Sequence, residues 1–418
     1  MSRPWTRALV LALAQLLLAG CRVGSEPRSS GDGGAPADGG MPGGGRTDAT
    51  SSGDASAPDA DAPDASIPPD LDDFVRARMM TVHAPGLAAV VVRGSQVVLA
   101  RAWGQADITA NRPVSPDTLF MLGSISKTVT AVALMQLYEQ GRFVLDDPID
   151  ANLGRVVRNP NFPSVPITYR MLLSHTSSIE DGGYGNYYVY NMDSPIALDS
   201  FVDGFLRPGG AYYDASNWNS TAAPGTNYSY SNVGVALAGD LVEKISRLNL
   251  QQYCQQHIFT PLGMSESSFF LRDLDRAHIA MPYQLDASGA YVAAGYYAYP
   301  DYPDGQLRTS ASQLARFLMA FSQYGQLGGV QILERSTIDE MRRQQPSSQE
   351  GLSWEYATIA GHAVMGHNGG DIGVSTGMWF DPATSAGIVV LTNGDVPTST
   401  DYQALSEIQD RLLMLGEP

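Results

Sequence analysis

The feature that most constrains the fold is a run from Thr128 to Glu139 that is apolar almost all round. Its apolar members are Val129, Ala131, Val132, Ala133, Leu134, Met135 and Leu137, and Gly141 and Pro148 follow it. A helix that is apolar on every face is a buried helix. We therefore expect this segment to form a central helix around which the rest of the chain packs.

Ser124 and Lys127 form a Ser-x-x-Lys motif immediately before this run. At the first turn of a helix, unpaired N–H groups and the positive dipole end favour developing negative charge. Lys127 would project from the same face, one turn away. A serine hydroxyl becomes a nucleophile when a base takes its proton, which a lysine can do once burial lowers its pKa and an arginine cannot.

The chain has a second lysine, Lys244, but Leu241 stands three residues before it, so the Ser-x-x-Lys motif occurs once. A helix N-cap serine with a lysine in the first turn explains the motif equally well. Taken alone, the motif leaves both interpretations open.

Residues 1–20 have the pattern of a signal peptide, with Arg3 and Arg7 before an apolar run that is too short to span a bilayer comfortably. The segment ends Leu-Ala-Gly-Cys at Cys21, which resembles the lipobox of bacterial lipoproteins. This resemblance implies that Cys21 is the first mature residue and carries the lipid, since several acyl chains give stable anchoring. The alternative is an ordinary cleaved signal with a chance cysteine. We expect an exported lipoprotein that is membrane-anchored and faces the periplasm or the cell surface.

Residues 21–70 are built mainly from Gly, Ser, Ala, Pro and Asp and contain no aromatic residue. Such a segment cannot bury enough surface to offset its ordering entropy, so we expect a disordered linker. As a flexible coil it would span about 35–40 Å and hold a domain clear of a membrane. The predicted organisation is therefore a leader (1–20), a linker (21–70) and one domain (71–418).

The formal net charge is −17. The leader contributes +2 and the linker −6, which leaves −13 for residues 71–418. An acidic domain without a Lys/Arg cluster argues against nucleic acid and anionic headgroups as partners. Besides Cys21 the chain has one cysteine, Cys254, which we expect to be a buried small hydrophobe. No His or carboxylate spacing indicates a metal site, and we expect no cofactor.

Strand patterns stand near both ends of the domain and helical patterns between them. Strands are predicted at 87–92, 96–102, 363–366, 377–380 and 387–392, and helices at 71–83, 233–245, 308–322 and 402–415. Thr168 is a candidate cap for a further short helix. We predict a mixed α/β (α+β) domain, in which one antiparallel sheet is built from both termini, helices flank it and a helical lobe is inserted.

Two stretches are rich in tyrosine, from Tyr184 to Tyr190 and from Tyr296 to Tyr302. We favour solvent-side loops held by ring packing. The alternative is that they wall an active-site cleft.

Two further motifs add to Ser-x-x-Lys. Tyr230-Ser231-Asn232 opens the helix predicted at 233–245, and His367-Asn368-Gly369-Gly370 follows a predicted strand. With these three motifs in order, residues 71–415 resemble the class C β-lactamase-related serine hydrolases, which have a β-lactamase/transpeptidase-like fold. The family includes penicillin-binding DD-peptidases, D-aminopeptidases, esterases and class C β-lactamases. Lesser family segments also match, at 172–177, 261–264 and 391–393.

The resemblance implies roles for three catalytic residues. Ser124 is the acylated nucleophile, Lys127 accepts its proton, and Tyr230 passes a proton to the leaving group and then activates water. A tyrosine beside a lysine amine can titrate below its usual pKa of about 10, which we expect for Tyr230.

The resemblance also implies a substrate-binding set. Asn232 hydrogen-bonds the acyl side of the substrate, the amides of Ser124 and Gly370 form the oxyanion hole, and His367 and Gly369 line the strand beside the substrate. Glycines let a backbone approach a ligand closely.

Two rival motifs are weaker. Tyr184-Gly185-Asn186 repeats the Tyr-x-Asn pattern, but in a glycine-rich loop. Residues 373–377, with Ser375 at their centre, match the Gly-x-Ser-x-Gly elbow, which requires a following helix that the sequence does not predict.

His367 stands where class C β-lactamases carry a lysine, and an imidazole holds a carboxylate less strongly than an ammonium group. Antibiotic hydrolysis is therefore in doubt. We expect a small ester or amide as substrate, with esters ahead of D-amino-acid peptides and β-lactams last. The competing function is a catalytically idle lipoprotein that binds cell-wall peptides. The presence of Ser124, Lys127 and Tyr230 together argues against it.

Overall fold

The computed structural model describes residues 67–418 except Asn186 and Pro397. The predicted leader, Cys21 and all but the last four residues of the predicted linker lie outside the described residues, so those expectations stay predictions.

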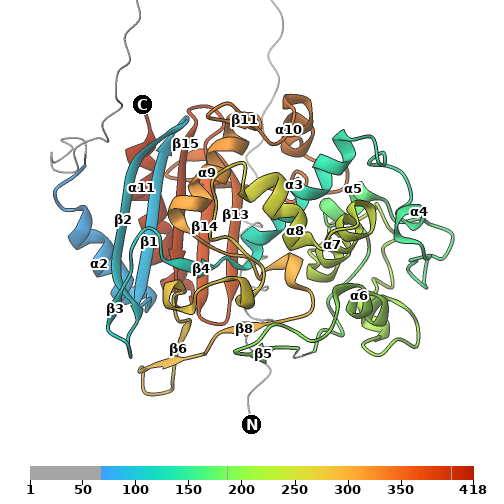
Figure 1. Cartoon of the computed structure of the whole chain (residues 1–418), viewed down its shortest axis with the longest axis horizontal. Coiled ribbons are helices and arrows are strands. Elements are labelled where there is room, and N and C mark those ends of the chain that lie inside the picture. The colour runs from blue at the N-terminus through green and yellow to red at the C-terminus, as the bar shows by residue number, and fades with distance from the viewer. Residues whose placement is uncertain (1–66, 186, 397) are drawn as a thin grey trace, which may run out of the picture.

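A seven-stranded antiparallel sheet forms the centre of the domain, in the order β12-β13-β14-β15-β1-β2-β3 (Figure 1). Its strands are β1 (Gly86–Arg93), β2 (Gln96–Asp107), β3 (Arg112–Pro113), β12 (Glu355–Ile359), β13 (His362–Asp371), β14 (Val374–Phe380) and β15 (Ala386–Thr392). β1 pairs with both β2 and β15, with Val90 opposite Val389. The prediction of one antiparallel sheet made from both termini is confirmed.

The residues of β1 alternate between two cores, as the period of a strand requires. Ala88, Val90 and Val92 belong to the core that also contains the central helix. The neighbouring residues Leu87, Ala89 and Val91 belong to the second core. Helices α2 (Leu71–Val82) and α11 (Ser399–Gly416) cover this second face and pack against each other.

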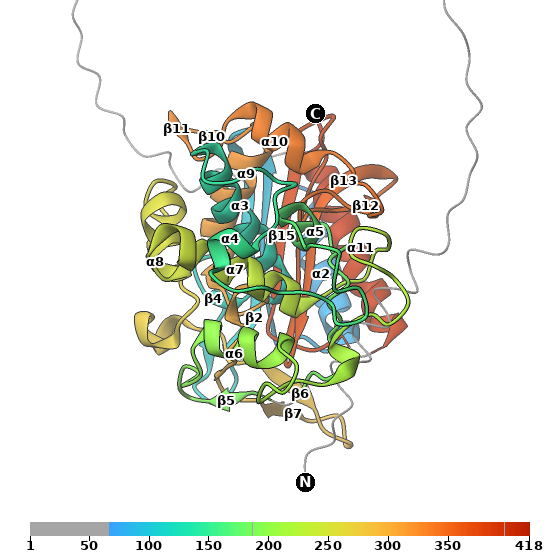
Figure 2. The same ribbon diagram turned by 90° about the vertical axis from the view of Figure 1, so that its right-hand side faces the viewer.

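The helix expected to be central is α3 (Ser126–Glu139), and it is buried along almost its whole length. It packs against α7 (Asn232–Ser246), while α9 (Ala311–Ser322) lies on β1 and β15. The inserted helical lobe is confirmed; it lies to the right of the sheet in Figure 1 and in front of it in Figure 2. Its other helices are α4 (Asp150–Leu153), α5 (Tyr169–Leu173), α6 (Leu198–Leu206) and α8 (Leu250–Cys254).

Several sequence expectations differ from the structure in their bounds, and three of the differences have a clear cause. The helix predicted at 308–322 begins at Ala311, because residues 308–310 form β9 (Arg308–Ser310), which pairs with β4 (Leu119–Met121), and Ser310 then caps the helix. β12 was not predicted because its alternating residues are only half-buried at the sheet edge. β13 extends to Asp371, beyond the predicted end. The prediction stopped early because Asn368, Gly369 and Gly370 have low intrinsic strand propensity.

The remaining elements are short. They are β5 (Val189–Tyr190), β6 (Tyr283–Leu285), β7 (Tyr291–Ala293), β8 (Tyr297–Ala298), β10 (Gln326–Leu327), β11 (Val330–Gln331) and α10 (Arg335–Arg342). Cys254 is buried and free, and burial raises the pKa of its thiol, as expected of an inert small hydrophobe. Within residues 67–418, as far as they are described, no helix has the length and apolar character that crossing a membrane requires.

Candidate active site

Ser124 lies in a single 3₁₀ turn, Gly123–Ile125, that leads directly into α3. Lys127, in the first turn of α3, is completely buried, and its Nζ lies 3.0 Å from Ser124 Oγ. The same Nζ donates to the backbone carbonyl of Asp304 at 2.7 Å. No side chain caps the N-terminus of α3, so the interpretation of Ser124 as an N-cap residue is wrong.

Tyr230 joins this pair from the residue before the N-cap of α7. Its ring centroid lies 5.1 Å from Lys127 Nζ, and the Ser124 side chain is close enough to lower its pKa in part. Desolvation and the carboxylate of Glu355 raise the pKa of Tyr230 well above its ordinary value, and the influence of Ser124 offsets only part of this rise. The expectation of a lowered pKa was wrong, because burial outweighs the nearby amine. At neutral pH the phenol is protonated and is able to give up a proton.

His175 holds the backbone on both sides of Tyr230. Its carbonyl accepts the N–H of Ser229 at 2.7 Å, and its Nδ1 accepts the N–H of Ser231 at 3.1 Å. The imidazole also packs against the phenol, with ring centroids 4.4 Å apart. Because Nδ1 is an acceptor, the ring proton lies on Nε2, which faces the buried carboxyl group of Glu350 at 3.6 Å.

Asp181 fixes the start of α7, and therefore Asn232. Its carboxylate accepts the backbone N–H groups of Asn232 at 2.8 Å and Val233 at 3.2 Å, and the hydroxyl of Ser231 at 3.0 Å. The Asn232 side chain is largely buried at the first position of the helix. Sequence motifs did not indicate Asp181 or Glu350, because each reaches the site from a loop distant in the chain.

β13 makes unusually close contact with the turn that carries Ser124. A Cβ on Gly369 would lie 1.9 Å from the carbonyl oxygen of Leu122, and a Cβ on Gly123 would lie 2.7 Å from the amide nitrogen of Gly370. Thr376, on β14, donates to the same Leu122 carbonyl at 2.6 Å. This contact places the Gly370 amide beside the nucleophile turn, as an oxyanion hole made with the Ser124 amide requires.

His367 is almost fully buried on β13. Its Nδ1 lies 2.5 Å from the Asn368 carbonyl oxygen, which can only accept, so Nδ1 carries a proton. Its Nε2 is buried and lies 3.8 Å from Glu355 Oε1. Burial lowers the pKa of His367, so the imidazole is mostly neutral at neutral pH.

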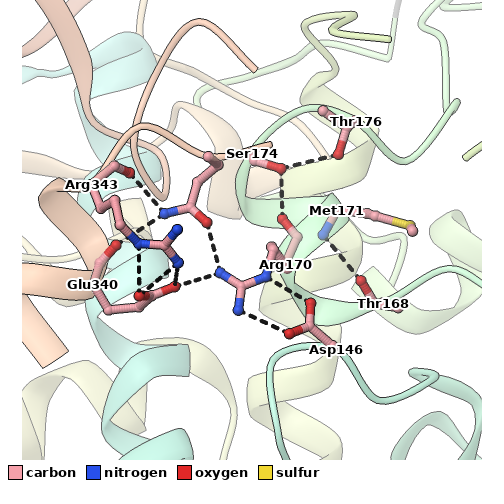
Figure 3. A network of polar contacts seen from close by, with 9 residues as sticks. Asp146, Thr168, Arg170, Met171, Ser174, Thr176, Glu340 and Arg343 are labelled. Atoms are coloured by element: carbon pink, nitrogen blue, oxygen red, sulfur yellow. Dashed lines mark hydrogen bonds and ion pairs between the residues drawn. The ribbon is translucent and has the colours of Figure 1, made fainter. Parts of the chain in front are cut away.

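An arginine network holds the loop that carries His175 (Figure 3). Arg170 binds Asp146 through two parallel bonds of 2.6 and 3.0 Å and also pairs with Glu340 of α10. These bonds lower the pKa of Asp146, while Arg343 and Arg170 together lower that of Glu340. The Arg170 carbonyl then accepts the hydroxyl of Ser174 at 2.8 Å. The residue before His175 is thereby tied to α5 and α10.

The two tyrosine-rich stretches meet through β5 and β8. Tyr297 and Tyr299 are buried and pack against Tyr188, so the solvent-side interpretation is wrong for the second stretch, whereas ring packing is confirmed. Tyr188 donates to Asp371, the residue after Gly370, at 2.8 Å. The cluster therefore lies beside the end of β13.

Neither rival motif gains support. The Tyr184 hydroxyl is hydrogen-bonded to Asp301, and Asn186 lies outside the described residues. Ser375 lies inside β14 and is nearly buried, and a strand continues where the elbow motif requires a helix.

One group of possible metal ligands occurs in the described part of the chain, formed by His362, Asp381 and Glu417. His362 Nδ1 lies 3.0 Å from Asp381 and 3.4 Å from Glu417, which an ion pair explains equally well. The sequence did not indicate this group because folding brings its members together from β13, the loop after β14 and the C-terminus. It lies at the end of β13 opposite to Gly370.

Comparisons with known proteins point to one family. A family model described as "Beta-lactamase" matches residues 71–411. Penicillin-binding protein 4* of Bacillus subtilis is 28% identical over 348 residues, which are 79% of this chain and 72% of that protein. Protein flp of Staphylococcus aureus is 25% identical over 77% of this chain, and the match spans 62% of its length.

Solved structures share the fold. The octameric penicillin-binding protein homologue from Pyrococcus abyssi has a TM-score of 0.64 at 27% identity, with 81% of this chain and 76% of that chain covered. The D-amino acid amidase from Ochrobactrum anthropi SV3 has a TM-score of 0.66 at 20% identity, with 83% and 98% covered. The second likeness concerns the fold alone.

Proposed function

Since the chain belongs to the beta-lactamase family of serine hydrolases, we propose that it cleaves small esters or amides through an acyl-enzyme formed on Ser124. The observation that carries the proposal is the 3.0 Å contact between Lys127 Nζ and Ser124 Oγ, with the Tyr230 ring centroid 5.1 Å from the same amine. A nucleophile and its base within hydrogen-bond reach are the signature of covalent catalysis.

In the proposed first half-reaction, the neutral amine of Lys127 takes the proton of Ser124 as its oxygen bonds to the acyl carbon. The amides of Ser124 and Gly370 stabilise the oxyanion, and each such donor is worth about 3–4 kcal/mol. The carbonyl re-forms as the bond to the leaving group breaks. Tyr230 gives its proton to the leaving group and recovers one from Lys127.

In the second half-reaction, water attacks the acyl-enzyme. Tyr230 and Lys127 together take one proton from the water, and the Ser124 oxygen leaves and is reprotonated. The acid is released and the free enzyme restored. No step requires a cofactor or a metal ion.

Among substrates we propose esters first, D-amino-acid amides or peptides next and β-lactams last. The support is the neutral, buried imidazole of His367 at the position where class C β-lactamases have a lysine. A β-lactamase and an idle binder of cell-wall peptides are the alternatives.

The test compares covalent labelling of the domain by a fluorophosphonate. Ser124→Ala should abolish labelling, while Ser375→Ala, the matched control from the rival motif, should keep it. Values of kcat/KM for a chromogenic short-chain ester, a D-alanyl dipeptide and a chromogenic cephalosporin then rank the substrates. Labelling that survives in Ser124→Ala and disappears in Ser375→Ala would overturn the proposal, and absence of turnover on all three substrates would favour the idle binder.

We also propose that the protein is exported and anchored to a membrane through lipid on Cys21. The support is the sequence pattern of residues 1–21 and the linker composition that follows. In this arrangement the domain faces the periplasm or the cell surface.

A further inference from the structure

Glu355 places a carboxylate beside His367 at the edge of the active site. It is the first residue of β12 and pairs with Gly366, so it is the cross-strand neighbour of the residue before His367. Its Oε1 lies 3.8 Å from His367 Nε2, and its side chain is 29% exposed. The carboxylate is therefore accessible from solvent, whereas the imidazole is not.

The pair formed by Glu355 and His367 carries no net positive charge in either protonation state of His367. If Nε2 carries no proton, the imidazole is neutral and Glu355 is the only charge of the pair. If Nε2 is protonated, its positive charge is neutralised by the carboxylate at 3.8 Å. In neither state does the pair offer a free positive charge to a substrate carboxylate.

The negative charge of Glu355 also acts on Tyr230, the residue proposed to protonate the leaving group. After desolvation, Glu355 is the largest influence that raises the pKa of Tyr230, and it also raises those of Tyr228 and Tyr402. The charge of Glu355 also favours the protonated forms of Glu350 and His367.

Of the other titratable groups at this place, Glu350 and His175 are neutral, and the third, Lys127, is held at Ser124. Burial raises the pKa of Glu350 well above its ordinary value and lowers the pKa of His175, so both are neutral at neutral pH. The amine of Lys127 lowers the pKa of His367, but it is held by Ser124 and the Asp304 carbonyl and is present alike in wild type and in Glu355→Gln.

We infer that Glu355 is a specificity-determining residue, which disfavours leaving groups that carry a carboxylate and directs the enzyme to esters and amides with neutral or cationic leaving groups. The inference rests on the proposed function, in which the leaving group departs toward Tyr230. A peptide that ends in a free D-amino acid, or a penicillin, places its carboxylate on the leaving amine and so is repelled. An amino-acid amide or a simple ester carries no such charge.

The test uses two acetyl esters that differ by one charge, those of 3-hydroxybenzoate and 3-hydroxybenzamide. The ratio of kcat/KM for the neutral ester to that for the anionic ester is measured in wild type, Glu355→Gln and Glu407→Gln. Glu407, on α11, provides a matched charge change, since it pairs with Arg78 of α2, across the sheet from Ser124. We expect the ratio to fall about 5- to 10-fold in Glu355→Gln only, as loss of one nearby partly screened charge predicts.

Ionic strength gives a second measurement that needs no variant. Raising salt from about 0.01 to 0.5 M shortens the Debye length several-fold, so the wild-type ratio should fall toward that of Glu355→Gln, and the ratio of the variant should change little. If the ratio of kcat/KM for the neutral to the anionic ester is the same in wild type and Glu355→Gln, the role proposed for Glu355 is wrong and the hydrolase proposal stands. If wild type cleaves neither ester and no fluorophosphonate label forms on Ser124, the proposed function itself fails.

Discussion

Lys127 shows how a single residue can be both structural and chemical. Its amine is fully buried, and one of its bonds, to the Asp304 carbonyl at 2.7 Å, aims it at the Ser124 hydroxyl 3.0 Å away. A buried amine without such a bond would be free to turn away from the serine. The backbone carbonyl thus orients the proposed base, and the helix α3 fixes its distance to the proposed nucleophile.

Replacing Lys127 by arginine separates proton transfer from positive charge. Guanidinium stays protonated in proteins, so Lys127→Arg places a positive charge near Ser124 that cannot accept a proton. We expect the acylation rate, measured by stopped flow at several pH values, to fall about 10²–10⁴-fold. Thermal melting checks that the bulkier side chain is accommodated. A folded variant within a few-fold of wild type would contradict the role of Lys127 as base.

His175 is a positioning residue, and its backbone conformation allows a clean test. Its φ is +54°, which glycine and asparagine tolerate better than other residues. His175→Asn keeps an acceptor near the Ser231 N–H, whereas His175→Gly removes it. Loss of one hydrogen bond that aims Tyr230 should lower kcat about 10- to 100-fold in the glycine variant, with KM little changed.

The asparagine variant should recover most of the lost kcat. Steady-state kinetics on the short-chain ester, together with melting temperatures, measure both variants. If kcat and the melting temperature fall equally in the two variants, His175 has only a structural role.

At the scale of elements, sequence patterns predicted what is regular and missed what depends on distant partners. The period of apolar residues predicted α3, α7 and the strands at both ends. The start of α9 could not be predicted, because residues 308–310 are held as a strand by pairing with residues 119–121, which lie far away in the chain.

For the site, three motifs identified the residues that the structure brings together around Ser124. They could not identify Glu350, Glu355 or Asp181, because isolated carboxylates carry no local signal. The pKa direction of Tyr230 was wrong for the same reason, since burial and Glu355 come from the tertiary structure.

The contact between β13 and the nucleophile turn can be tested with two glycines. In Gly369→Ala the new Cβ meets the Leu122 carbonyl oxygen at 1.9 Å, so the strand must move away from the turn. We expect a loss of about 2–3 kcal/mol in unfolding free energy and loss of most activity. Gly234→Ala, within α7, makes only ordinary contacts of 3.4 Å or more and should be neutral or stabilising by up to about 1 kcal/mol.

Chemical denaturation and ester hydrolysis measure both variants. A Gly369→Ala enzyme with wild-type stability and activity would show that the close approach of β13 to the turn is not required.

At the scale of the molecule, the N-terminal and C-terminal parts of the domain are one structural unit. α2 packs on α11, and β1 lies between β2 and β15, so neither end of the domain can be removed without opening the sheet. The catalytic site is shared in the same way, because Ser124 lies near the start of the domain and Gly370 near its end. By contrast, residue 21, the proposed anchor point, is separated from α2 by about 50 residues of chain.

This separation predicts that anchoring and catalysis are independent. Cys21→Ser should move the protein from the membrane fraction to the soluble fraction, with unchanged specific activity on the short-chain ester. Fractionation with immunoblotting and an activity assay on each fraction measures both. Membrane retention of the variant would mean that Cys21 is not the lipid site or that another element holds the protein.

The sheet order also imposes a sequence of events during synthesis. A chain that emerges N-terminus first presents the Ser124 turn early, but the strand that provides the Gly370 amide and the strand that pairs with β1 come among the last 60 residues. Until the ribosome has made them, the nucleophile has no oxyanion partner and β1 has one free edge. The candidate site can therefore form only after β13 and β15 have been added to the chain.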